Sequence, residues 1–176
     1  FPIAAGVGLS YSSYTWTSRI KKEDGLVRLV FGLGTRAVDR IGEDYARMIH
    51  LSHPLLRPEV EAQQIMKYSQ KIVDVLNLKT GEMESIPHNT LLKEISHPDL
   101  YLTVSINQDG HLSAPMFKGQ PINPVGTCLT FENLLSKTVF PSLMKKMLRQ
   151  LQDAYGRPVD IEFAWDDEHL YILQCR

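Results

Sequence analysis

Residues 159–176 read Val-Asp-Ile-Glu-Phe-Ala-Trp-Asp-Asp-Glu-His-Leu-Tyr-Ile-Leu-Gln-Cys-Arg, and they carry the clearest structural signal in the chain. Two apolar segments flank a short acidic group, which is the pattern of a β-hairpin. Side chains alternate between the two faces of a strand, so Glu162 shares a face with Asp160. On the return strand, Gln174 and Arg176 also share one face. The hairpin is therefore able to bring a carboxylate, an amide oxygen and a guanidinium together.

The length of the turn decides whether these groups meet. A three-residue turn at 167–169 pairs Glu162 with Gln174, and residues directly opposite each other point to the same side. A two-residue turn at 167–168 pairs Glu162 with Leu173 instead and directs Gln174 to the opposite face. A shared site therefore requires a turn with an odd number of residues.

The residue types fit a magnesium–nucleotide site. Magnesium prefers hard oxygen ligands and combines one or two carboxylates with substrate phosphates, and Glu162 and Gln174 would supply one charged and one neutral oxygen. Arg176 offers a planar set of donors that matches a phosphate group. The alternative is a hairpin whose polar face meets water, with Asp160 and Arg176 as a surface ion pair. The spacing alone leaves both interpretations open.

The same residues resemble the end of the ATP-binding domain of phosphoenolpyruvate synthase and pyruvate phosphate dikinase. That family's pattern is Val-Asp-Ile-Glu-Phe/Trp, a short variable turn, and Leu-Tyr-Ile-Leu-Gln-x-Arg-Pro. Gln174 and Arg176 lie 12 and 14 residues after Glu162, as in the family. The resemblance implies that Glu162 and Gln174 bind the metal and the nucleotide, and that Arg176 contacts the phosphates.

A second segment, residues 29–34, resembles the family's Gly-Leu-Gly segment. The resemblance implies nucleotide or phosphate contacts at Gly32, Gly34 and Arg36. The family often continues with Glu where Thr35 stands in this chain. A lone Gly-x-Gly also occurs in ordinary turns, so a structural turn is the alternative interpretation here.

The resemblance implies an ATP-grasp architecture, in which ATP lies between two α+β lobes. Residues 1–176 are then a partial nucleotide-binding domain, mainly the C-terminal lobe, with a middle segment at about 58–128 that matches the family poorly. The N-terminal lobe and the phosphohistidine domain are expected elsewhere in the parent chain. The family's Thr-x-Gly-Gly-x-x-x-His signature is absent from this sequence. We therefore expect no catalytic residue in this fragment and no turnover by the fragment alone.

The implied function is that of the ATP-binding portion of a phosphotransferase similar to phosphoenolpyruvate synthase (pyruvate, water dikinase). Such an enzyme passes phosphoryl groups from Mg–ATP to a histidine on another domain, and the protein mainly positions groups and offsets charge. ATP is the expected substrate and Mg²⁺ the expected cofactor. Two alternatives remain: a related phosphotransferase with a different acceptor, and a degenerate or regulatory lobe that binds nucleotide or a partner without catalysis.

The overall composition excludes several other classes. With 19 Lys and Arg against 20 Asp and Glu, the formal net charge is -1, which argues against nucleic acid or an anionic membrane as the main partner. No apolar run approaches the ~20 residues of a membrane span. Cys128 and Cys175 form no C-x-x-C pair, so reduced thiols in a cytoplasmic protein are expected.

Elsewhere the sequence predicts an α+β fold with a mainly antiparallel sheet and helices packed on one side. Strands are expected at 3–10, 26–31 and 45–51, and hairpins at 71–86 and 100–112. Helices are expected at 58–70, 89–95 and 141–155; in the last, apolar residues recur at steps of three and four. Loops are expected at 32–40 and 115–124.

Overall fold

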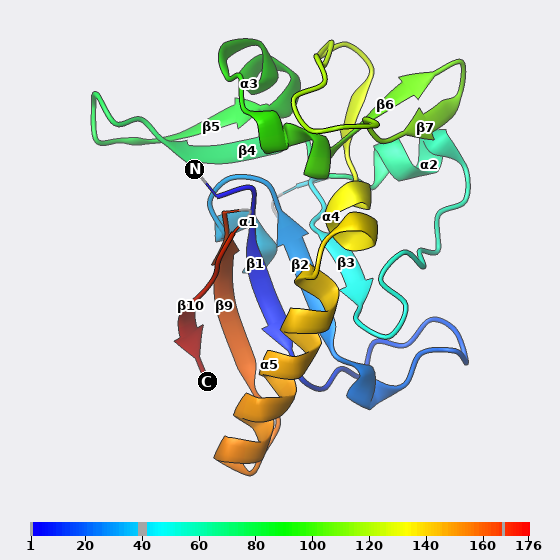
Figure 1. The fold of residues 1–176 in the computed structure, drawn as a ribbon, viewed down its shortest axis with the longest axis vertical. Helices are drawn as coiled ribbons and strands as arrows, with labels where there is room; N and C mark the ends of the chain where they lie inside the picture. The colour runs from blue at the N-terminus through cyan, green and yellow to red at the C-terminus, as the bar shows by residue number, and fades with distance from the viewer. Residues whose placement is uncertain (1, 39–41, 167) are drawn as a thin grey trace.

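A computed structural model describes residues 2–38, 42–166 and 168–176 of the chain (Figure 1). Its centre is a five-stranded antiparallel sheet with the strand order β10-β9-β1-β2-β3. The strands of this main sheet are β1 (Ala4–Leu9), β2 (Leu26–Val30), β3 (Arg47–His50), β9 (Asp160–Trp165) and β10 (Leu170–Cys175).

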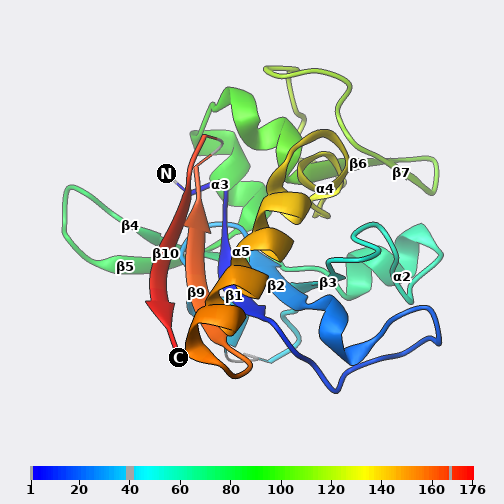
Figure 2. The same ribbon diagram turned by 60° about the horizontal axis from the view of Figure 1, so that its bottom comes forward.

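One face of the main sheet is covered by the long helix α5 (Phe140–Tyr155), which follows α4 (Glu132–Lys137) in the chain (Figures 1 and 2). Pro141 stands in the first turn of α5, where a missing backbone N–H breaks no helical hydrogen bond. Gly156 ends the helix with a φ of 67°, a left-handed conformation that favours glycine. The helix predicted at 141–155 is therefore confirmed.

Alternate side chains of β9 form the core beneath α5. The rings of Phe163 and Trp165 lie 5.8 and 5.6 Å from the ring of Phe140, measured between centroids. Ile161 is buried in the same layer. Burying an apolar side chain of this size stabilises the fold by about 1.5–3 kcal/mol. Because these residues face α5, alternation places Glu162 on the opposite face of the sheet.

Two smaller sheets lie beyond one end of the main sheet (Figure 1). The first is the hairpin of β4 (Ile72–Leu76) and β5 (Met83–Pro87), which leads into α3 (His88–Glu94). In the second, β6 (Val104–Gln108) lies between β7 (His111–Ser113) and β8 (Thr127–Leu129). The remaining elements are the short helices α1 (Thr35–Val38) and α2 (Ala62–Lys67), and 3-10 turns at Lys22–Asp24 and Pro98–Leu102.

The predicted fold class is confirmed: the chain is α+β, its sheets are antiparallel, and its long helix covers one side, as in an ATP-grasp-like lobe. Both predicted internal hairpins form. The loop prediction at 32–40 is wrong in part, because α1 forms within it; residues 39–41 lie outside the described residues. Neither α4 nor β8 was predicted, because both are too short for a periodic signal in the sequence.

No helix in the described part of the chain is both long enough and apolar enough to cross a lipid bilayer.

Candidate functional site

The hairpin of β9 and β10 brings Glu162 and Gln174 directly opposite each other. This predicted pairing is confirmed, but the turn that was expected to produce it is wrong. Nearer the turn, Leu170 pairs with Trp165, so residues 166–169 join the two strands. A regular ladder extended from that turn would place Gln174 on the wrong face.

An irregularity at Leu173 corrects the register. The pairing shifts by one residue between Ile172 and Gln174, so Leu173 is the extra residue of a β-bulge. Beyond the bulge, the backbone N–H of Arg176 donates to the carbonyl of Asp160 at 2.8 Å, and the reverse bond measures 3.0 Å. The predicted backbone pairs Glu162–Gln174 and Asp160–Arg176 therefore both form. They form because the strand contains an extra residue, and not because the turn has an odd number of residues.

The side chain of Asp166 explains the longer turn. Its Oδ1 accepts hydrogen bonds from the backbone N–H groups of Glu168 at 3.1 Å and His169 at 2.8 Å, while its Oδ2 accepts one from the Tyr171 hydroxyl at 2.8 Å. The bond from Tyr171, followed by that from His169, lowers the pKa of Asp166. Asp residues favour turns through such local bonds. Asp167, which belonged to the predicted turn, lies outside the described residues.

The side chains of Glu162 and Arg176 meet on the face away from α5. Arg176 Nη2 donates to Glu162 Oε1 at 2.9 Å. The side chain of Arg176 is 63% exposed and that of Glu162 is 35% exposed. An ion pair this open to solvent stabilises the fold by at most about 1 kcal/mol. The expected alternative, a surface ion pair between Asp160 and Arg176, is not found among the described residues. The structure thus brings together Glu162, Gln174 and Arg176, and Gln174 is exposed beside the pair.

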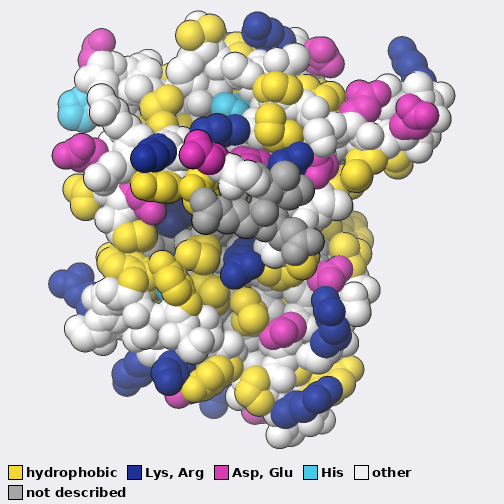
Figure 3. Space-filling view, turned by 180° about the vertical axis from the view of Figure 1, so that it is seen from behind, with side chains coloured by type: hydrophobic (Ala, Val, Ile, Leu, Met, Phe, Trp, Pro, Cys, Tyr) yellow, Lys and Arg dark blue, Asp and Glu magenta, His cyan; other side chains and the backbone are white. Residues whose placement is uncertain are grey.

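Glu162 belongs to a row of side chains that crosses the sheet. Val7 of β1 lies opposite Glu162, Arg28 of β2 lies opposite Val7, and Met48 of β3 lies opposite Arg28. Paired residues in antiparallel strands point to the same side. Neighbouring strands are about 4.8 Å apart, so the backbones of Glu162 and Arg28 are separated by roughly 10 Å. Figure 3 views the molecule from the side opposite α5, where basic, acidic and hydrophobic side chains are interspersed.

Arg28 is a further candidate, which was not predicted from the sequence. Its Nη1 donates to the carbonyl of Val38 at 3.5 Å, and its Nε is buried without a hydrogen-bond partner among the described residues. Arg28 also lines a cavity of about 300 Å³ between the sheet and α1. The other residues lining this cavity are Arg36, Ala37, Val38, Asp44, Tyr45, Ala46 and Met48. The available signal was a single cation in the middle of an apolar strand.

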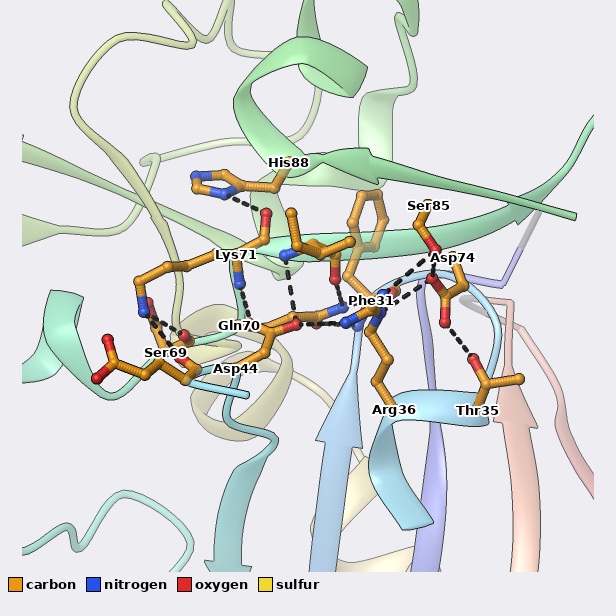
Figure 4. A network of polar contacts seen from close by, with 12 residues as sticks. Phe31, Thr35, Arg36, Asp44, Ser69, Gln70, Lys71, Asp74, Ser85 and His88 are labelled. Atoms are coloured by element: carbon orange, nitrogen blue, oxygen red, sulfur yellow. Dashed lines mark hydrogen bonds and ion pairs between the residues drawn. The ribbon is translucent and has the colours of Figure 1, made fainter. Parts of the chain in front are cut away.

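Arg36 forms ion pairs within the chain (Figure 4). Its Nε donates to Asp74 Oδ1 at 2.9 Å and its Nη1 to Asp44 Oδ2 at 3.2 Å. Its Nη2 donates to the hydroxyl of Ser85 at 3.2 Å. The side chain of Arg36 is only 11% exposed, so the guanidinium holds α1 against β4 and β5.

Asp74 is the centre of this network. Besides Arg36, its carboxylate accepts hydrogen bonds from Thr35 Oγ1 at 2.7 Å and Ser85 Oγ at 2.6 Å. Burial raises the pKa of Asp74, but the bonds from Ser85, Thr35 and Arg36 together outweigh burial and hold the pKa below its ordinary value of 3.8. Asp74 is therefore stabilised in its charged form.

Gly32 allows the loop before α1 to approach β4. Its φ is 89°, and an added Cβ would lie 2.5 Å from Val73 Cγ1 and 2.6 Å from the carbonyl oxygen of Asp74. At Gly34 an added Cβ would come no closer than 3.7 Å to its nearest neighbours. The geometry around Gly32 is therefore that of a tightly packed structural turn.

Replacing Asp74 with asparagine is expected to lower the free energy of unfolding by about 3 kcal/mol at pH 7, because Arg36 loses a buried charged partner. The folded pKa of Asp74 is lowered, so the wild type keeps this stability above the unfolded value of 3.8 and loses it as pH falls through the folded pKa. The difference between the two proteins should therefore shrink below pH 3.8. Urea unfolding between pH 7 and pH 3 measures it, with Asp153→Asn on the exposed side of α5 as control. A difference that stays constant with pH would contradict the role of this carboxylate.

Comparison with known families assigns the whole chain. The model of the family described as "Pyruvate phosphate dikinase, AMP/ATP-binding domain" matches residues 1–176. The matched range includes both the β9–β10 hairpin and the Gly-Leu-Gly segment. Comparison with curated proteins gave no match.

Proposed function

The chain belongs to the pyruvate phosphate dikinase AMP/ATP-binding domain family, and from that premise we propose that it binds Mg–ATP for a phosphotransferase similar to phosphoenolpyruvate synthase. In this proposal the enzyme is cytoplasmic, and phosphoryl groups pass from ATP to a histidine on another domain of the parent chain. The facing ATP-grasp lobe also comes from the parent chain. Residues 1–176 supply contacts to the metal and the phosphates, and no nucleophile.

The observation that carries the proposal is the pairing of Glu162 with Gln174 on the solvent-facing side of β9 and β10, with Arg176 beside them. One carboxylate and one amide oxygen are a donor set that fits magnesium, which takes its remaining ligands from phosphates and water. When bound, the ion offsets charge on the phosphate oxygens. Glu162 and Gln174 would hold it, and Arg176 would donate to a phosphate from the same edge of the sheet.

Arg28 adds a second cation to this face. Its position in the same cross-strand row as Glu162 puts it on the side where the phosphates would lie. Its buried Nε, which has no hydrogen-bond partner within residues 2–38, 42–166 and 168–176, gives it a donor that a phosphate oxygen would satisfy. We therefore include Arg28 among the phosphate-binding residues.

Gly32 and Gly34 of the loop before α1, together with Arg36 of α1, have a structural role in this proposal. The three guanidinium nitrogens of Arg36 already donate to Asp74, Asp44 and Ser85. These residues would shape the nucleotide site by fixing the loop and α1 beside the open face of the sheet. Direct phosphate contact by Arg36 would require it to leave the buried carboxylate of Asp74.

Calorimetric titration of Mg–ATP into the full-length protein tests the proposal. Arg176→Met is expected to weaken binding about tenfold or more, because a charge-assisted hydrogen bond to phosphate is lost. Arg157→Met, which removes an exposed arginine in the loop after α5, is the matched control and should bind like the wild type. Omitting magnesium should also weaken binding to the wild type. Failure of the wild type to bind Mg–ATP, or equal binding by both variants, would refute the proposed site.

A further inference from the structure

A second cavity lies at the outer edge of β3, where both Arg47 and Met48 line it. Its volume is about 210 Å³, and two arginines, Arg47 and Arg57, line it. Arg47 pairs with Leu29 of β2, a residue fully buried in the core. Because paired residues point to one side, Arg47 lies on the α5 side of the sheet, whereas Glu162 lies on the opposite side. The two arginines therefore belong to a different set of donors from Glu162, Gln174 and Arg176, although this cavity shares Tyr45, Ala46 and Met48 with the cavity beside Arg28.

The two guanidinium groups carry buried donors for which the described residues offer no acceptor. Arg47 Nη1 donates to the carbonyl of Met48 at 2.9 Å. Arg47 Nε, Arg47 Nη2 and Arg57 Nη2 are all buried and have no hydrogen-bond partner among the described residues. Buried charged donors are normally paired, because leaving them unsatisfied is unfavourable. Three such donors from two side chains at one cavity indicate a site for an oxyanion.

The charges around the cavity support an anionic ligand. Burial, and then the charge of Arg57, lower the pKa of Arg47 to about 10, although Glu59 and Glu132 act in the opposite direction. Neither glutamate forms an ion pair with either arginine in the described part of the chain. The two cations are thus close enough to disfavour each other's charge, and the nearby acids offset this only in part. An added anion between them would relieve the repulsion.

The rest of the lining is partly apolar. The rings of Tyr45 and Tyr68 meet edge to face with centroids 5.3 Å apart, and Ile65 and Leu129 complete this wall. The cavity is smaller than the ~300–1,000 Å³ of typical pockets for larger ligands. Its size and lining suit a compact molecule and not a nucleotide.

We propose that Arg47 and Arg57 form a binding site for a small dianion, either a phosphate monoester or a dicarboxylate, whose short apolar part rests against Tyr45 and Tyr68. Each guanidinium donates to the oxygens of the ligand through the nitrogens that have no hydrogen-bond partner in the described part of the chain. Glu59 also lines the cavity, and its negative charge would keep the anionic groups of the ligand away from its own carboxylate. The site does not depend on the proposed nucleotide function.

Calorimetry on the full-length protein tests the proposal with two probes, inorganic phosphate and malonate. The ionic strength is held constant by replacing chloride with the probe anion. We expect at least one probe to bind the wild type, and Arg47→Met and Arg57→Met to weaken it about tenfold or more. Arg157→Met is the control for charge removal at the surface. Arg176→Met is the control for anion binding at the nucleotide site, and it should leave the affinity unchanged. The stronger probe identifies the ligand as phosphate-bearing or carboxylate-bearing.

Circular dichroism and thermal unfolding of each variant separate loss of the site from loss of the fold. If Arg47→Met does not fold, Arg57→Met carries the test, because Arg57 is only half-buried and lies in a segment without regular structure. Absence of binding of both probes to the wild type would overturn the proposal. So would binding that both cavity variants retain, or binding that disappears in Arg176→Met, which would place the anion at the nucleotide site.

Discussion

Replacing Glu162 with glutamine is expected to reduce ATP-dependent phosphorylation of the full-length enzyme at least about a hundredfold, since even outer-shell partners of metal ligands contribute 10–100-fold. Glutamine keeps the size of the side chain and one oxygen ligand, but it removes the negative charge that would hold magnesium. The variant also removes the ion pair with Arg176. Incorporation of labelled phosphate from ATP into the protein measures the effect.

The control for this substitution is Glu168→Gln, which removes a carboxylate from the turn of the same hairpin, where the side chain is 82% exposed. This variant should retain wild-type phosphorylation. Both variants should keep their stability to within about 1 kcal/mol, because exposed ion pairs contribute little. Phosphorylation by Glu162→Gln within a few-fold of the wild type would remove the metal role assigned to this residue.

Replacing Gly6 with alanine is expected to lower the free energy of unfolding by at least about 4 kcal/mol, which is a large part of the stability of a typical domain. Gly6 lies in β1, in the middle of the main sheet, between Leu29 of β2 and Phe163 of β9. An added Cβ would collide with the carbonyl oxygen of Arg28. That oxygen belongs to the backbone of a central strand, so it is unable to move aside as a flexible side chain would.

Gly34→Ala is the matched control for Gly6→Ala. An added Cβ there would lie 3.7 Å from Ala5 Cβ and from the backbone nitrogen of Gly6, which is ordinary van der Waals contact. We expect a change of less than about 1 kcal/mol in the free energy of unfolding. Urea unfolding of both variants gives the comparison. Equal stabilities of Gly6→Ala and Gly34→Ala would show that the sheet adjusts at Gly6 and would contradict this explanation.

Local patterns in the sequence were sufficient to predict the hairpin and the long helix. Alternation along β9 distinguished Phe163, which enters the core, from Glu162, which does not. Steps of three and four residues marked the buried face of α5, where Met144 and Leu148 are buried. Both signals depend only on neighbours in the chain, so they are visible before the fold is known.

The turn and the bulge were not predictable in the same way. The turn is set by hydrogen bonds that the Asp166 side chain accepts from the backbone. The sequence does not reveal these bonds, because a solvent-exposed acidic turn without them would have the same amino-acid composition. A bulge adds one residue to a strand without a distinctive residue type, and Leu173 resembles its neighbours. The predicted pair of Glu162 and Gln174 was therefore correct although the reasoning about the turn was not.

The positions of Arg28 and of the second cavity follow from the three-dimensional path of the chain, and the sequence does not reveal that path. β1 lies between β2 and β9, although β9 follows β1 by about 150 residues. Only this order places Arg28 in one row with Glu162. The proximity of Arg47 and Arg57 likewise depends on the path of the chain after β3, which carries no periodic signal. These groups become visible only when segments distant in sequence are placed side by side.

The extra residue at 173 has a consequence for how this region tolerates change. On the turn side of Leu173 the strands follow one register, and on the side of Glu162 they follow another. A residue inserted or deleted at the tip of the hairpin can therefore be compensated by the gain or loss of a bulge. Glu162 and Gln174 then remain opposite each other. Relatives of this chain are accordingly free to differ in the length of the connection between these two strands and still present the same ligands to a nucleotide.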